Sequence, residues 1–191
     1  LSEEYDVIQP LALGGITYGV SDLELTAAYA AIADGGQYRR PVFYTKVTDS
    51  KGNILIDNTE NKATQVFKAS TASLLTNAME DVLEKGTGAA ARLDNMHAAG
   101  KTGTTNEAKD LVFAGFTPYY TAAIWATYDT HAEFPESDRE FHKRLWAKVM
   151  NEIHEGLADM DFETSATVQE ATICTKTGLL ARSSCPSITE Y

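Results

Sequence analysis

The chain has 191 residues, of which 43% are apolar, so it is long enough to bury one substantial core. Its formal net charge is -11, and no cluster of lysines or arginines could neutralise a phosphate backbone, which argues against nucleic acid as a partner. No apolar run approaches the roughly 18 residues that span a bilayer. The first residues include neither an initiator methionine nor a basic signal region. We therefore interpret the chain as one domain, or a large piece of one, taken from a longer protein.

Two helices are predicted in the first half of the chain. Ser21 with Glu24 three residues later is typical of a capping box, and Gly35 with Gly36 ends the apolar periodicity that follows. A second amphipathic helix is predicted from Ser70 to Gly86. Between the two helices, residues 42–49 and 53–57 predict a peripheral hairpin.

The second half predicts an antiparallel sheet and a third helix. Strands are expected over residues 98–105, 111–117 and 120–128, with short connections that favour a meander. A helix is expected from about Ser137 to Leu157, with His142 and His154 on its surface. The apolar face predicted for this helix consists of Phe141, Leu145, Trp146, Val149, Met150, Ile153 and Leu157. Helices outside a central antiparallel sheet give an α+β fold class.

The stretch with the most potential chemistry runs from Ala98 to Thr105 and contains Lys101, Thr102, Gly103, Thr104 and Thr105. In a strand, alternation puts Lys101 on one face and Thr102 with Thr104 on the other, while the small residues admit a second backbone nearby. A lysine and threonine hydroxyls suit a carboxylate or a developing oxyanion. The alternative is a solvated glycine-rich turn.

Several other candidates carry weaker signals. A second Lys-Thr-Gly at residues 176–178 is followed by leucines and is interpreted as a chance repeat. His97 is expected to be an ordinary residue at the start of a strand. Asp94, Asn106, Glu107 and Asp110 are expected to be solvated turn residues.

The two cysteines, Cys174 and Cys185, lie close together near the C-terminus. Their spacing favours a disulfide, and half of a metal site or two free thiols are the alternatives. The sequence has no CxxC motif, and no histidine lies near these cysteines, so a metal site is the weakest of the three alternatives.

Lys101, Thr102, Thr104 and Thr105 are called the clamp below, because together they suit an anion. The sequence supplies no nucleophile to accompany this clamp. No serine is followed three residues later by lysine, the spacing that sets an amine beside a hydroxyl within one helical turn. No Ser-x-Asn is present either.

The order of motifs resembles the class A penicillin-binding proteins, the bifunctional peptidoglycan synthases. The motifs that carry this resemblance are residues 11–15 and 19–21, Leu25 with residues 28–36, Tyr38 to Pro41, Gly86-Thr87-Gly88, residues 100–105, Asp110 with residues 113–118, and Cys174 with residues 178–180 and 185–186. The sequence departs from the family pattern at two places. Asp22 stands where the family usually has proline, and Leu111-Val112 stands where an aromatic residue is common.

The resemblance implies a transpeptidase fold of the kind shared with serine β-lactamases, here its C-terminal part over residues 1–165. Residues 166–191 would be an appended strand and cysteine-containing tail. In the family the Ser-x-x-Lys and Ser-x-Asn motifs precede the segment that begins here at Leu1, so their absence indicates truncation. The membrane anchor and glycosyltransferase domain would also lie upstream. The domain would work outside the cytoplasmic membrane, where a disulfide between Cys174 and Cys185 persists.

The family mechanism implies roles for the clamp. Lys101 would supply positive potential and assist proton transfer, Thr102 and Thr104 would hold the substrate carboxylate, and the Thr104 N–H would form half of the oxyanion hole. A twist or a bulge at Gly103 would be one way to reconcile these roles with strand alternation. Peptidoglycan stem peptides and β-lactams are the implied ligands, the N-terminal part of the same protein is the implied partner, and no cofactor or metal is implied. A serine β-lactamase or DD-carboxypeptidase and a non-catalytic scaffolding fragment are the alternatives.

Overall fold

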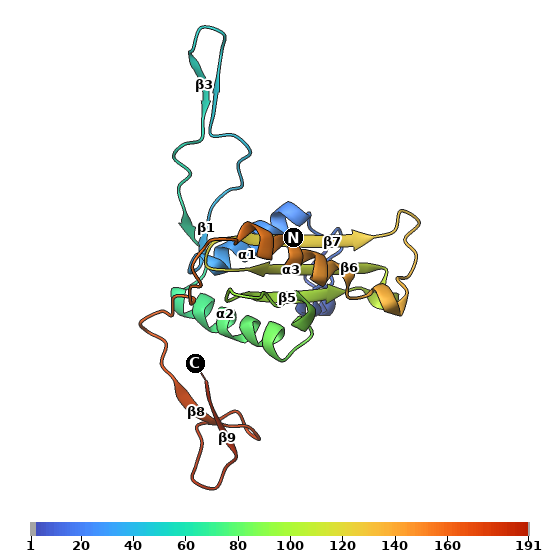
Figure 1. Ribbon diagram of the computed structural model, residues 1–191, viewed down its shortest axis with the longest axis vertical. Helices are drawn as coiled ribbons and strands as arrows, with labels where there is room; N and C mark the ends of the chain where they lie inside the picture. Colours follow the sequence, from blue (N-terminus) through green and yellow to red (C-terminus); the bar gives the residue numbers. More distant parts are fainter. Residues whose placement is uncertain (1–2, 191) are drawn as a thin grey trace.

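A three-stranded antiparallel sheet forms the centre of the protein (Figure 1). This computed structural model describes residues 3–190, so the predicted region limits at Leu1 and Tyr191 lie outside the described residues. The strands follow in chain order as β5 (Ala99–Thr104), β6 (Asp110–Phe116) and β7 (Thr121–Thr127), with the short 3-10 helix η3 (Asn106–Ala108) in the first connection. The predicted meander and the α+β class are confirmed.

Helices cover both faces of this sheet. The predicted capping box begins α1 (Asp22–Ala33): the Glu24 N–H donates to Ser21 Oγ at 3.2 Å, and the Ser21 N–H donates to Glu24 Oε2 at 2.8 Å. Helix α1 packs on the face that carries Phe116, and α2 (Ala69–Glu84) lies along β5. Helix α3 (Phe141–Ile153) packs on the opposite face, which carries Phe113. Three further 3-10 helices are η1 (Gln9–Leu13), η2 (Ala89–Ala91) and η4 (Glu136–Asp138).

Two hairpins project from this body (Figure 1). The predicted peripheral hairpin consists of β2 (Lys46–Thr48) and β3 (Ile54–Asp57), and the pairing of β1 (Gln37–Tyr38) with β4 (Thr64–Gln65) closes its base. The C-terminal hairpin pairs β8 (Ala171–Cys174) with β9 (Ser187–Glu190). A disulfide joins Cys174 to Cys185 in this second hairpin.

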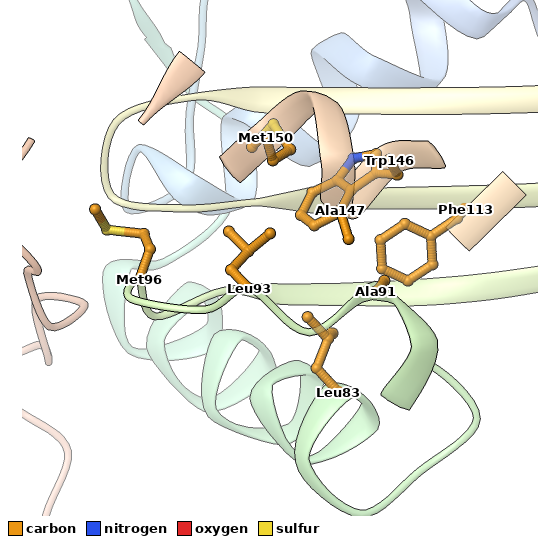
Figure 2. Close-up of a cluster of buried hydrophobic side chains, with 8 residues drawn as sticks. All are labelled: Leu83, Ala91, Leu93, Met96, Phe113, Trp146, Ala147 and Met150. Atoms are coloured by element: carbon orange, nitrogen blue, oxygen red, sulfur yellow. The ribbon is translucent and has the colours of Figure 1, made fainter. Parts of the chain in front are cut away.

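The main hydrophobic core lies between the sheet, α3, η2 and the end of α2 (Figure 2). Its centre is an edge-to-face pair of the Phe113 and Trp146 rings, whose centroids are 4.9 Å apart. Gly100 and Gly115 are paired across β5 and β6 beside these rings. A Cβ on Gly115 would lie 2.8 Å from atoms of both rings, and one on Gly100 would lie 2.6 Å from Phe113. The two glycines are therefore required for space, because they leave room for the rings to approach the sheet.

The predicted apolar face of α3 is partly wrong. Trp146 and Met150 are buried as expected, but the rest of the buried face consists of His142, Lys143 and Ala147, joined by His154 after the helix ends. The remaining predicted core residues form an apolar ridge whose members are 37–47% exposed, namely Phe141, Leu145, Val149, Ile153 and Leu157. The helix is thus rotated relative to the prediction, and its buried face includes two polar residues, His142 and Lys143.

The two histidines expected on the surface are buried. His154 is 6% exposed, and its Nε2 and Nδ1 are hydrogen-bonded to Thr117 Oγ1 at 2.8 Å and to the Met150 carbonyl at 2.6 Å. His142 is 2% exposed, and neither of its ring nitrogens has a partner among the described residues. Burial, with a smaller contribution from Lys143, lowers the pKa of His142.

Within residues 3–190 no helix combines the length and apolar character needed to cross a membrane.

The packing predicts different costs for two glycine substitutions in the same sheet. Gly115→Ala should lower the free energy of unfolding by about 1–3 kcal/mol, because two rigid rings must shift. Gly103→Ala should change it by less than about 0.5 kcal/mol, since the new Cβ meets only Val112 at 3.4 Å. Denaturant unfolding of both variants measures the difference. Equal destabilisation would contradict the steric role of Gly115.

Candidate functional site

The predicted clamp lies on β5, which is an edge strand of the sheet in the described part of the chain. Its pairing with β6 is regular from Ala99 opposite Phe116 to Thr104 opposite Leu111. A bulge at Gly103, the alternative to a twist, is therefore absent from this register. Burial decreases along the strand: Ala99 and Gly100 are buried, whereas Lys101 and Thr104 are exposed.

The hydrogen-bonding direction of β5 follows from one contact at its end. The Thr105 N–H donates to the Asp110 carbonyl at 3.2 Å, so the backbone groups of Thr105 face β6. In an antiparallel pair such residues alternate with residues whose backbone groups point away from the partner. The backbone N–H and C=O groups of Lys101 and Gly103 therefore face β6, while those of Thr102 and Thr104 point toward the outer edge. This row of outward backbone groups can accept an extended peptide as an added strand.

The clamp side chains reach this edge from both faces of the strand. Lys101 Nζ donates to the Thr102 carbonyl at 3.1 Å, so the ammonium group bends back along β5 toward the outer edge. The Thr102 hydroxyl lies 2.8 Å from the Thr87 hydroxyl, across a short gap between β5 and the turn after α2. Because β5 is an edge strand, side chains from both of its faces reach the same outer edge, and no bulge is needed. Sequence reasoning missed Thr87, although its signal was present in the motif Gly86-Thr87-Gly88.

Asp110 was expected to be a solvated turn residue, and this expectation is wrong. It begins β6, and its side chain is only 17% exposed. Trp125 Nε1 donates to Asp110 Oδ1 at 3.0 Å, while the Thr105 hydroxyl and His131 Nε2 each lie 3.1 Å from Oδ2. Desolvation opposes ionisation of Asp110, but the bonds from His131, Trp125 and Thr105 outweigh it and lower the pKa.

Thr105 is occupied by this same arrangement. Its hydroxyl accepts the Asp110 N–H at 2.8 Å and donates to the Asp110 carboxylate. It therefore closes the connection between β5 and β6. Asp94, Asn106 and Glu107 are exposed, as predicted.

The remaining candidates lie away from the clamp. Lys176 is in the turn that follows β8 in the C-terminal hairpin, outside the sheet that contains Lys101. His97 precedes β5 and has three acidic neighbours, with Asp161 Oδ1 nearest at 3.1 Å from Nε2. One of the others, Glu80, has a pKa raised by burial against the opposing influence of His97. No group of three or more metal-ligating side chains is placed to hold an ion within the described range.

Comparison with known proteins identifies the family. Residues 3–155 match the family model described as the penicillin-binding protein transpeptidase domain. The chain belongs to this family. The resemblance inferred from the motifs is thereby confirmed, and the observed sheet and helices agree with the fold it implied.

Relatives in several bacteria cover most of the chain. Penicillin-binding protein 1A of Clostridium perfringens is 33% identical over 90% of this chain and 20% of its own length. Penicillin-binding protein 4 of Bacillus subtilis is 41% identical over 65% of this chain and 20% of its own length. The chain thus spans about a fifth of these relatives.

Solved structures share the fold. Penicillin-binding protein 1A from Haemophilus influenzae superposes with a TM-score of 0.75 at 19% identity, covering 89% of this chain and 32% of the other. The PonA1 protein from Mycobacterium tuberculosis in complex with penicillin V gives a TM-score of 0.66 at 26% identity, covering 75% and 41%.

The environment of Asp110 predicts a pH-dependent contribution to stability. A lowered pKa favours the folded state when the carboxyl is ionised, so this contribution is present above the ordinary value of 3.8 and is lost as the pH falls through the depressed value. Asp110→Asn should therefore reduce the free energy of unfolding by about 1–3 kcal/mol at pH 7 and by less at pH 3. Denaturant unfolding at the two pH values measures this change. Asp129→Asn, at an exposed position after β7, is the control, and a loss for Asp110→Asn as large at pH 3 would contradict the argument.

Proposed function

We propose that this chain is the C-terminal part of the transpeptidase domain of a class A penicillin-binding protein, which crosslinks peptidoglycan through an acyl-serine intermediate. The observation that carries the proposal is the outer edge of β5. There, outward backbone groups, a lysine and threonine hydroxyls converge, in a chain that belongs to the transpeptidase family.

The edge supports a distinct role for each clamp residue. A stem peptide or a β-lactam would lie along β5 as an added strand, with Gly103 admitting its backbone. Its terminal carboxylate would accept hydrogen bonds from the Thr102 and Thr104 hydroxyls. Lys101 would supply positive potential and assist proton transfer, and the outward Thr104 N–H would donate to the developing oxyanion. Thr105 would act indirectly, by closing the turn to β6.

The reaction proposed for the complete site has two acyl transfers. A serine hydroxyl attacks the carbonyl of the penultimate D-alanine, the amide bond breaks, and terminal D-alanine leaves with the proton. An amine from a neighbouring stem peptide then attacks the acyl-serine ester and releases the serine. A β-lactam would acylate the same serine: its ring amide bond breaks, the nitrogen takes the proton, and this amine stays attached to the acyl group. Hydrolysis of the ester by water would define a carboxypeptidase or β-lactamase, and product analysis separates these outcomes.

The serine and the Ser-x-Asn motif would come from an upstream part of the same protein. Such a part would also cover the exposed apolar ridge of α3, because an apolar stripe on a helix indicates packing against another segment. We assign residues 1–165 to the transpeptidase domain and residues 166–191 to an appended hairpin held by the disulfide. An upstream glycosyltransferase domain and membrane anchor would place the site outside the cytoplasmic membrane, where this disulfide is stable.

Replacement of the clamp lysine tests the assignment in the full-length protein. Lys101→Ala should slow acylation by a fluorescent penicillin about a hundredfold, the typical effect of removing one preorganised charge-stabilising group. Lys176→Ala is the matched control, because it removes a lysine from the other Lys-Thr-Gly sequence. A similar loss in both variants would contradict the choice of β5.

Labelling of the separate parts tests the division of the active site. The 191-residue chain alone should form no covalent adduct with the fluorescent penicillin, because its sequence supplies no Ser-x-x-Lys nucleophile. Addition of the upstream part, which would carry the serine, should produce labelling. Gel fluorescence reports both results. Labelling of the chain alone would refute the proposed location of the serine.

A further inference from the structure

The clamp is connected to a turn outside the sheet that no motif-based role includes. Residues 86–88 link α2 to η2, and within this turn the exposed Thr87 reaches Thr102, hydroxyl to hydroxyl, at 2.8 Å. Gly88 anchors the turn: its N–H donates to the Val82 carbonyl at 2.8 Å, and its carbonyl accepts from Ala91 at 2.8 Å. A Cβ on Gly88 would lie 3.0 Å from Val82, so the turn lies tightly against the end of α2.

A buried lysine fixes the same turn from the other side. Lys143 of α3 is 6% exposed, and its Nζ donates to the Thr87 carbonyl at 2.9 Å and to Glu140 Oε1 at 2.6 Å. Burial of an ammonium group is costly unless it is paired and hydrogen-bonded, and both conditions are met here. Because Glu140 compensates its charge, the effect of Lys143 on the clamp is chiefly to hold Thr87 in position.

The hydroxyl pair has a directional consequence for a bound carboxylate. A threonine hydroxyl has one donor and two acceptor positions. A carboxylate only accepts, so the Thr102 hydroxyl must direct its own proton toward it. Thr102 can then still accept the proton of Thr87, and this second hydrogen bond polarises the first.

We propose that Thr87 is a positioning residue of the clamp, which orients the Thr102 hydroxyl toward the carboxylate of the ligand, and that Lys143 holds Thr87 in place for this purpose. The inference rests on the proposed transpeptidase function. It adds a layer of residues behind the clamp, contributed by the turn after α2 and by α3.

The test compares a ligand that has the carboxylate with one in which it is masked. In the full-length protein, second-order acylation rate constants are measured for benzylpenicillin and for its methyl ester by competition with a fluorescent penicillin. Thr87→Val should slow acylation by the acid about tenfold, the effect of a hydrogen bond that strengthens contact with a charged group. It should slow acylation by the ester less than about twofold, and Thr87→Ser should restore reaction with the acid.

Lys143→Met and Lys148→Met provide a second comparison on one helix, because Lys148 is exposed. Lys143→Met should slow acylation by the acid more than by the ester, whereas Lys148→Met should change neither. Thermal unfolding of every variant accompanies the kinetics. If Lys143→Met does not fold, the Thr87→Val and Thr87→Ser pair decides the question.

The outcomes separate this inference from the proposed function. Equal loss with both ligands in Thr87→Val, or no loss with either, would overturn the positioning role while acylation of the wild-type protein still supported the transpeptidase. Absence of acylation in the wild-type protein would overturn both proposals.

Discussion

Both the fold and the proposed site depend on the pairing of β5 with β6. This pairing uses one side of β5 and leaves its other side as the outer edge of the sheet in the described part of the chain. Antiparallel pairing uses the backbone groups of alternate residues, so the contacts that anchor Lys101 and Gly103 also turn Thr102 and Thr104 outward. The pairing therefore fixes the strand as a rigid support and sets the spacing of its outward donors and acceptors. A loop with the same residues would have to be ordered when the ligand binds, at a cost in conformational entropy.

Space at the centre of the sheet links this edge to the core. Gly100 and Gly115 allow the Phe113 and Trp146 rings to lie directly against the strands, which brings α3 close to the sheet. At this distance Lys143, three residues before Trp146, reaches the carbonyl of Thr87. The packing of apolar rings thus determines where a polar contact behind the clamp is made. This relation explains how residues distant in the sequence act on one strand.

Features with local signals could be predicted from the sequence, whereas features that depend on packing could not. The capping box at Ser21, the second helix and the meander each follow from residues close together in the chain. The buried face of α3 depends on which of its sides meets the sheet, and periodicity alone favoured a ridge that is exposed. The partial burial and hydrogen bonding of Asp110 depend on Trp125 and His131, which come from the next strand and the loop beyond it. Even where the clamp strand was predicted, its edge position, which makes a bulge unnecessary, depends on the whole sheet.

Electrostatics explains why hydroxyl orientation matters at such an edge. The chain carries a net charge of -11, but at physiological ionic strength exposed charges are screened over about 8 Å, so an anionic ligand responds mainly to nearby groups. Lys143 is paired with Glu140, whereas Lys101 donates to a backbone carbonyl in the part of the chain that the structure describes. Lys101 attracts anions without selecting their geometry. A neutral amide can meet a hydroxyl in either orientation, but a carboxylate requires the proton, so a neighbour that fixes this orientation favours the charged ligand.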